Sequence, residues 1–90
     1  MKYFEWNFAK NEWLKQERGI SFEDFLEAFG RYQVLDIIPH PNKRQYKNQK
    51  IFIVEINNYV YAVPFVEDEQ KVFLKTIIPS RKLTKKYLKK

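Results

Sequence analysis

The feature that most constrains this sequence is a change in its hydrophobic period at Val34. Before this residue, apolar side chains recur every three or four positions, which is the spacing of amphipathic helices. After it, apolar and β-branched side chains fall in short runs separated by turn residues, which is typical of strands joined by hairpins. The pattern predicts an α+β fold in which two N-terminal helices pack on one face of an antiparallel sheet.

Two helices are predicted in the N-terminal part, after a short strand over 3–6. The first helix, over 8–18, has a mixed side that includes polar residues as well as tryptophan and leucine. The second helix, over 22–30, is better marked, because Ser21 and Asp24 have the spacing of a capping box. Its i, i+3, i+4, i+7 positions form one apolar stripe, made of Phe22, Phe25, Leu26 and Phe29.

Four strands and a short helix are predicted in the C-terminal part. Asn57-Asn58 is a two-residue hairpin signal, because asparagine tolerates a positive φ. Pro64 lies inside a strand, so its missing N–H must face an unpaired position or a bulge. Ser80 is suited to cap a terminal helix in which Leu83 and Tyr87 face the body of the domain. The predicted strands cover 34–38, 51–56, 59–66 and 72–78.

Charge divides the chain into two unequal parts. Residues 1–40 carry five basic and seven acidic side chains, whereas residues 41–90 carry twelve basic and four acidic ones, within a total of +6. Such an asymmetry favours a polyanionic partner, most often nucleic acid. For Lys89 and Lys90 alone, the alternative is a solvated tail.

Composition excludes several kinds of chemistry. The chain has no cysteine and a single histidine, His40, so we expect no disulfide, no thiol catalysis and no cysteine- or histidine-based metal site. No window reaches the roughly 20 apolar residues of a membrane span, and the first residues do not resemble a signal peptide. We therefore expect one soluble, cytoplasmic domain over 1–90 that uses no metal or other cofactor.

Motifs near both ends of the chain resemble a known family. Phe4-Glu5-Trp6-Asn7 with Lys10-Asn11, followed by Gly19-Ile20-Ser21-Phe22-Glu23, is similar to the opening signature of the BrnT-type toxins. Ile77-Ile78-Pro79-Ser80-Arg81-Lys82, with Lys85, resembles the terminal Ile-Ser-x-Arg-Lys element of that family.

The resemblance implies a small RelE-like domain that acts as a ribonuclease toxin of a type II toxin–antitoxin module. It also implies a cognate antitoxin that binds DNA, expected to be a ribbon-helix-helix protein, and that neutralises the toxin in a hetero-oligomer. Two departures leave an alternative open. Glu17-Arg18-Gly19 stands where the family commonly has Lys-His-Gly, and the usual glutamate of the terminal helix is missing. The alternative is a non-catalytic module of the same fold that binds RNA or only its antitoxin.

Arg81 and Lys82 are the first candidates for a role in RNA cleavage. Two cations in the first turn of a helix oppose the helix dipole, and a local rule broken in this way often marks a functional site. Together with the free N–H groups of the helix start, they would form a pocket for a phosphate. The alternative is a solvated helix surface.

Lys10 and Glu55 complete the candidate catalytic set. Lys10 matches the family signature, although its stem is also placed to lie over the rings of Trp6 and Trp13. Glu55 is the only acid inside the 51–56 strand and is a candidate general base, with an edge-strand or ion-pair role as the alternative. His40, between two prolines, is an ordinary loop histidine whose usual pKa would also suit proton transfer.

A second group of residues is expected to contact the RNA without acting in its cleavage. Tyr87 is as suited to anchor the terminal helix as to act on RNA. Tyr59, Tyr61 and Phe65 share one side of their strand and would either stack unpaired bases or pack against the sheet. The candidate RNA contacts are Arg44, Lys50, Lys85 and Tyr87.

Overall fold

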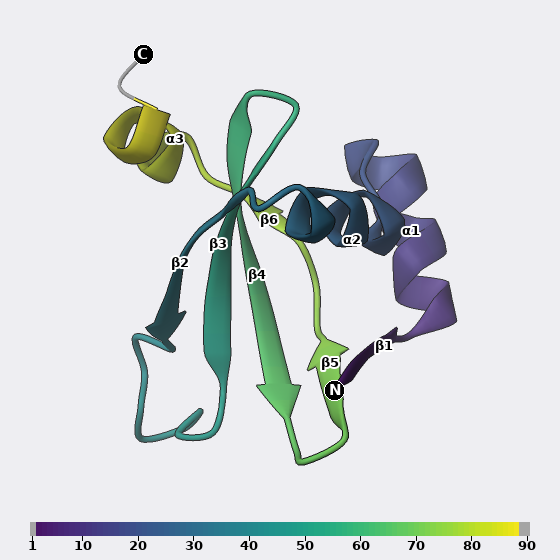
Figure 1. Cartoon of the computed structure of the whole chain (residues 1–90), viewed down its shortest axis with the longest axis vertical. Coiled ribbons are helices and arrows are strands. Elements are labelled where there is room, and N and C mark those ends of the chain that lie inside the picture. The colour runs from purple at the N-terminus through teal and green to yellow at the C-terminus, as the bar shows by residue number, and fades with distance from the viewer. Residues whose placement is uncertain (1, 89–90) are drawn as a thin grey trace.

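An α+β domain with three helices and a mixed sheet is seen in the computed structural model, which describes residues 2–88 (Figure 1). Two helices follow the first strand, and the remaining strands then precede a terminal helix, in the order that the sequence predicts. The elements are β1 (Tyr3–Trp6), α1 (Phe8–Arg18), α2 (Phe22–Gly30), β2 (Val34–Pro39), β3 (Lys50–Ile56), β4 (Tyr59–Glu67), β5 (Lys71–Leu74), β6 (Ile78–Pro79) and α3 (Arg81–Leu88).

The sheet has the strand order β1-β5-β4-β3-β2, and β6 pairs with β4 beyond the end of β5. The pairs β2–β3, β3–β4 and β4–β5 are antiparallel, and the β3–β4 hairpin turns at Asn57 and Asn58, whose φ angles are 54° and 64°. The fully antiparallel sheet that we expected is wrong, because β1 pairs in parallel with β5. Hairpin signals specify only strands adjacent in the chain, whereas β1 and β5 are separated by both helices and three strands.

The expected strand over 72–78 is broken into β5 and β6, and Pro64 accounts for the break. Leu74 pairs with Phe65 and Ile78 with Ala62, so three residues stand opposite two of β4. The carbonyl of Pro64 accepts the N–H of Lys75 at 2.8 Å. Because the N and O of a strand residue point to the same side, the missing N–H of Pro64 faces this break, as predicted for a proline within a strand.

Two apolar clusters lie on opposite sides of the sheet, and β3 contributes to both. Phe52, Val54 and Ile56 face the side of α2, while Ile51 and Ile53 face α3. Burial on both sides explains why β3 is almost continuously apolar. The larger cluster contains Leu14, Ile20, Phe22, Phe25, Ala28, Phe52, Val54, Ile56, Val63, Phe65, Val72, Leu74 and Ile77.

The helices do not share the sheet equally. Helix α2 lies over the strands with Phe22 and Phe25 fully buried, although Phe29, at the end of the predicted stripe, is 43% exposed. Helix α1 lies farther from the strands, alongside α2 (Figure 1). Its one fully buried apolar side chain is Leu14, so the expectation that both helices cover the sheet is correct only for α2. A helix side that includes Lys10 is too polar to cover strands.

Asn11 joins the two N-terminal helices. Its side chain is buried, and its Oδ1 accepts the N–H of Phe22, the first residue of α2, at 2.8 Å. Its Nδ2 donates to Glu23 at 2.8 Å, and this hydrogen bond lowers the pKa of the Glu23 carboxyl. Ser21 and Asp24 also form the predicted capping box. Asn11 therefore fixes the start of α2 from a neighbouring helix.

Replacing Asn11 with alanine should lower the free energy of unfolding by about 2 kcal/mol, because a buried N–H and a carboxylate would both lose their partner. Urea denaturation followed by circular dichroism would measure the change. Asn48→Ala, in an exposed loop, is the matched control and should have almost no effect. Equal stability of the two variants would show that Asn11 does not hold α2.

Candidate nucleic-acid interface

Helix α3 is held on the sheet by hydrogen bonds to one residue of β4. The Thr84 hydroxyl accepts the N–H of Val60 at 2.9 Å and donates to the Ser80 carbonyl at 2.7 Å. The N–H of Ser80 donates to the carbonyl of Val60 at 3.0 Å. Ser80 caps the helix as predicted, since its Oγ accepts the N–H of Leu83 at 3.1 Å. The sheet therefore fixes the position and orientation of α3.

The outer surface of α3 is basic. Arg81 and Lys82 are exposed in the first turn, which has no acidic residue, and Lys85 and Lys86 are exposed in the last turn. Within residues 2–88, none of these four side chains forms an ion pair. The sequence therefore places four cations on one short helix without neutralising them, and the first two also oppose the helix dipole.

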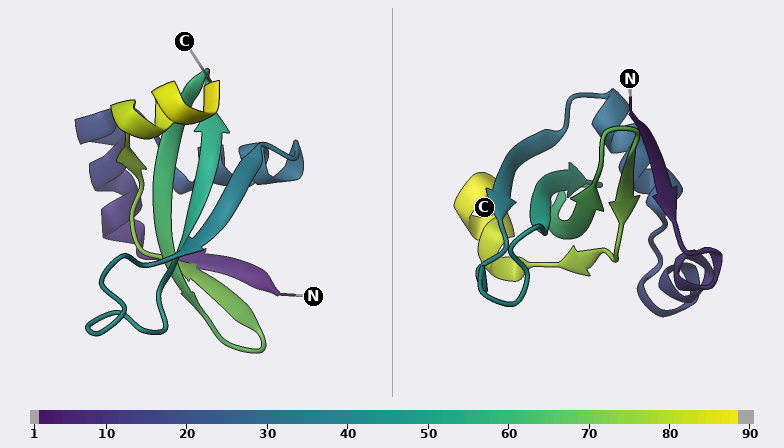
Figure 2. Two further views of the ribbon diagram at one scale, coloured as in Figure 1. Left: turned by 90° about the vertical axis from the view of Figure 1, so that its left-hand side faces the viewer. Right: turned by 90° about the horizontal axis from the view of Figure 1, so that it is seen from below.

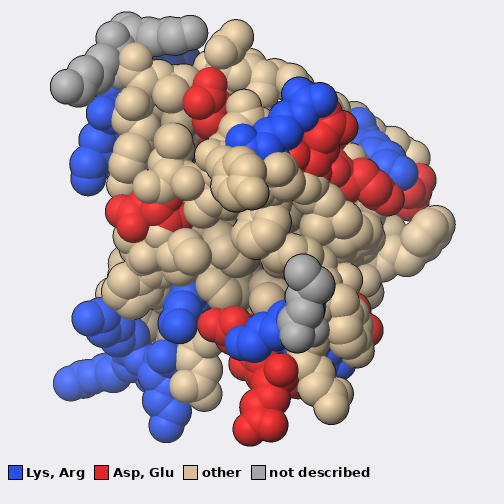
Figure 3. All heavy atoms as spheres, in the orientation of Figure 1, with Lys and Arg blue, Asp and Glu red and all other residues tan. Residues whose placement is uncertain are grey.

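The loop over 40–49 adds further cations on the same side of the molecule. Figure 2 shows α3 and this loop at the two ends of one side of the sheet, and Figure 3 shows a group of basic side chains at the lower left, where the loop lies. Lys43, Arg44 and Lys47 are exposed there, again without an ion pair in the part of the chain that the structure describes. The predicted contacts Arg44 and Lys85 thus share one side with Arg81.

Cations elsewhere are largely paired. Over the helices, basic and acidic side chains lie next to each other (Figure 3). Arg31 pairs with Glu27 at 3.0 Å and Lys15 with Glu12 at 2.9 Å. On β5, Lys71 pairs with Glu5 of β1 at 3.3 Å. Within residues 2–88, most cations without an ion pair therefore lie on the side of α3 and the loop, the others being Lys10, Arg18 and Lys75.

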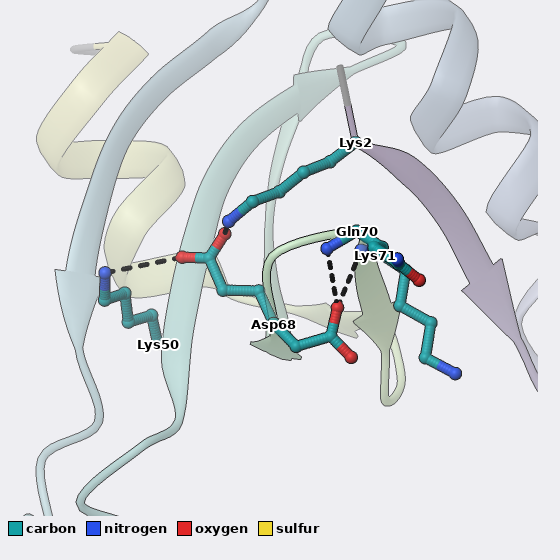
Figure 4. A network of polar contacts seen from close by, with 6 residues as sticks. Lys2, Lys50, Asp68, Gln70 and Lys71 are labelled. Atoms are coloured by element: carbon teal, nitrogen blue, oxygen red, sulfur yellow. Dashed lines mark hydrogen bonds and ion pairs between the residues drawn. The ribbon is translucent and has the colours of Figure 1, made fainter.

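Lys50, a predicted RNA contact, belongs to a network around Glu67 (Figure 4). Glu67 accepts from Lys2 at 2.6 Å and from Lys50 at 3.5 Å. The hydrogen bond from Lys2 is the main reason why the pKa of Glu67 is lowered. Asp68 closes the adjoining turn by accepting the N–H groups of Gln70 and Lys71 at 2.8 and 2.9 Å. Lys50 is therefore partly neutralised, unlike Arg44.

Tyr87 anchors α3 to β2. Its hydroxyl donates to Oδ2 of Asp36 at 3.1 Å, and partial burial together with this bond raises the pKa of the phenol. Oδ1 of Asp36 accepts the N–H of Ile37 at 2.8 Å. The sequence pattern does not single out Asp36 as a functional residue, although an acid inside a β-branched run is unusual in a strand. In the structure, the pairing of β2 with β3 is irregular at this point, because the register shifts between Val34 and Asp36.

Glu55 lies on the same side of the sheet as α3. Strand alternation places it with Ile51 and Ile53, which pack beneath that helix, and its ladder partner is Val60, to which α3 is bonded. Within residues 2–88 the carboxylate makes no hydrogen bond or ion pair. Asp36 and Glu55 are thus two carboxylates on the side of the sheet that carries the basic helix.

Lys10 is not brought together with Arg81. Its Nζ lies 4.2 Å from the ring centroid of Trp13, and the guanidinium of Arg18 lies 4.9 Å from the same centroid. Helices α1 and α3 are on opposite sides of the molecule in Figure 1 and in the right-hand view of Figure 2. Lys10 therefore forms a cation–π contact with Trp13, which agrees with the alternative that its stem lies over a tryptophan ring.

The strand aromatics pack against the sheet. Phe65 is buried and stacks on Phe52 with ring centroids 4.0 Å apart. The Tyr59 and Tyr61 rings meet edge to face at 5.6 Å, and burial raises the pKa of Tyr61. The exposed aromatic ring of the basic side belongs instead to Tyr46, which lies against His40 at 4.3 Å. A tyrosine between Arg44 and Lys47 is the sequence signal that would have found it.

Comparison of the chain with known protein families, curated protein sequences and solved structures found no match. The resemblance to the BrnT-type toxins therefore depends on the residues quoted for it. None of the helices within residues 2–88 is long and apolar enough to cross a membrane.

The ion pairs of Glu67 predict a pH-dependent contribution to stability. Because its folded pKa is lowered, the stabilisation is complete above the usual glutamate pKa of about 4.3 and disappears as the pH falls through the folded value. Glu67→Gln should lower the free energy of unfolding at pH 7 by less than about 1 kcal/mol, since the pair is partly exposed. Urea denaturation at neutral and acidic pH would measure this.

Glu69→Gln is the control, because Glu69 is exposed in the same turn and forms no ion pair within residues 2–88. It should leave the acid dependence of stability unchanged. A Glu67→Gln protein that keeps the full acid dependence would contradict the assignment.

Proposed function

We propose that this chain binds RNA through α3 and the 40–49 loop, and that it is a ribonuclease toxin of the BrnT type with a RelE-like fold. In this proposal it needs no metal and is neutralised by a cognate ribbon-helix-helix antitoxin. The observation that carries the proposal is the distribution of charge. The cations of α3 and the loop have no ion pair within residues 2–88, whereas most others are paired. Such a surface suits a polyanion.

The cleavage step is in-line attack of a ribose 2′-oxygen on the adjacent phosphorus. The P–O5′ bond breaks, which leaves a 2′,3′-cyclic phosphate and a 5′-hydroxyl. Arg81 and Lys82 would stabilise the charge that develops on the phosphoryl oxygens. Glu55 or Asp36 would accept the 2′ proton, since both carboxylates lie on the side of the sheet that α3 covers. A proton returned to the 5′-oxygen completes the step.

A second function, binding of RNA or antitoxin without cleavage, is favoured by the position of Lys10. That amine lies over Trp13 on α1, and α1 is on the opposite side of the molecule from α3, which carries Arg81 (Figure 1). The hydroxyl of Tyr87 donates a hydrogen bond to Asp36, and the pKa of the phenol is raised. Little of the phenolate is therefore present, which makes Tyr87 a poor base. The groups able to move protons near α3 are therefore few.

Arg81→Ala should abolish growth arrest on induced expression, together with the loss of total RNA that accompanies it. The reason is that a toxin of this kind depends on a cation at the scissile phosphate, whose loss costs about 10²–10³ in rate. Arg31→Ala removes the same charge from the C-terminal end of α2, where Arg31 is the cap residue and is paired with Glu27, and should leave the arrest intact. Circular dichroism of both variants verifies folding.

Arrest without RNA loss in the unmodified protein would contradict cleavage. Failure of the well-folded, unmodified protein to arrest growth would favour the binding function. Arrest that survives Arg81→Ala would exclude Arg81 from the site.

RNA binding should weaken steeply with salt, because contacts to phosphates release counterions. For a single strand, the slope of log K against log salt is about −0.7 for each phosphate contact. Arg44→Gln should therefore make the slope less steep by about 0.7, whereas Arg31→Gln should leave it unchanged. Fluorescence anisotropy over a salt series measures both slopes, and a flat response of the unmodified protein would exclude a phosphate-binding surface.

A further inference from the structure

The 40–49 loop presents an aromatic pair on the basic side of the molecule. The rings of His40 and Tyr46 have centroids 4.3 Å apart and planes inclined by 36°. Tyr46 is 39% exposed, whereas His40 is half-buried. One face of the tyrosine ring is thus supported by the imidazole, and part of the ring remains open to solvent.

Hydrogen bonds within the loop hold this pair in place. Nδ1 of His40 accepts the N–H of Asn42 at 3.0 Å, which fixes the plane of the imidazole and leaves its proton on Nε2 when neutral. The N–H of Tyr46 donates to the carbonyl of Asn42, and the carbonyl of Tyr46 accepts from Gln49, both at 3.0 Å. The N–H of His40 donates to Gln49 at 3.0 Å and closes the loop. These hydrogen bonds fix the backbone on which the two rings are carried, and the contact with His40 orients the ring of Tyr46.

The charge around the ring has one sign. Lys43, Arg44 and Lys47 surround Tyr46 in the sequence and are exposed, and no acidic residue occurs between Asp36 and Glu55. Tyr32 is more exposed, at 94%, but its neighbour Arg31 is paired with Glu27. Stacking of bases on aromatic rings, with cations along the backbone, is how proteins bind single-stranded nucleic acid. A duplex offers its phosphates but keeps its bases stacked within the helix.

We propose that Tyr46, supported by His40, stacks on an unpaired base of RNA while the neighbouring cations contact its phosphates. The loop thereby selects single-stranded RNA as the ligand. The inference rests on the proposed function, since it names the form of RNA that the basic side binds, but it assigns to Tyr46 a contact that charge alone does not supply.

Three RNA probes of equal length and equal salt test the proposal: a single strand, its blunt duplex, and the same strand with abasic sites. Fluorescence anisotropy gives a Kd for each. The unmodified protein should bind the single strand more tightly than the abasic strand. Tyr46→Ala should weaken binding of the single strand by about five- to one-hundredfold, as expected for the loss of one stacked base. It should change binding of the other two probes by less than about twofold.

Tyr32→Ala is the matched control, because it removes an exposed tyrosine that lies outside the basic loop. It should leave all three Kd values unchanged. Tyr46→Phe keeps the ring and should retain the affinity for the single strand. In Tyr46→Trp, added tryptophan fluorescence should be quenched by the single strand and not by the abasic strand, and this readout decides the matter if the alanine variant does not fold.

Equal affinities of Tyr46→Ala and the unmodified protein for the single strand would overturn the stacking role. The proposed function would still stand if that binding remained dependent on salt. A failure of the unmodified protein to bind any of the three probes would overturn both the stacking role of Tyr46 and the proposed function. Equal binding of the single and abasic strands would assign the loop to phosphate contacts alone and would also overturn the inference.

Discussion

Burial of β3 on both of its sides is the constraint on which the rest of the structure depends. Phe52 and Val54 complete the core beneath α2, and Ile51 and Ile53 complete a smaller one beneath α3. A chain of 90 residues has little apolar surface to divide between two cores. The smaller core is supplemented by hydrogen bonds from α3 to Val60. The helix that carries most of the candidate interface therefore owes its position to a strand in the middle of the sheet.

Much of the fold could be predicted because its signals are local. The caps at Ser21 and Ser80, the Asn57-Asn58 turn and the break opposite Pro64 each depend on a few residues and on known backbone preferences. The parallel pairing of β1 could not be predicted, because it joins strands at distant places in the chain. Helix α1 was expected on the sheet because Trp13 and Leu14 share a side, but cations cover Trp13.

The candidate site could also be predicted only in part, because the sequence shows where charges occur but not which residues the fold brings together. Charge asymmetry indicated the basic C-terminal part, which the structure places on one side of the molecule. Composition does not reveal which cations are neutralised, since the pairing of Lys50 with Glu67 depends on the sheet. The contact between Tyr87 and Asp36 likewise joins residues that only the folded chain brings together. The distance of α1, which carries Lys10, from α3 likewise depends on the tertiary structure (Figure 1).

The outer margin of β2 has a consequence for the way in which any partner can bind. In a strand, alternate N–H groups point away from the neighbouring strand, where an incoming chain would hydrogen-bond to them. The outward N–H of Ile37 is already taken by the carboxylate of Asp36. Two residues later, Pro39 has no N–H at all. Two of the donors that a guest strand would use are therefore taken or missing, so this part of the margin disfavours lengthening of the sheet and its self-assembly into larger sheets. Side chains are the groups that this stretch of β2 leaves for recognition.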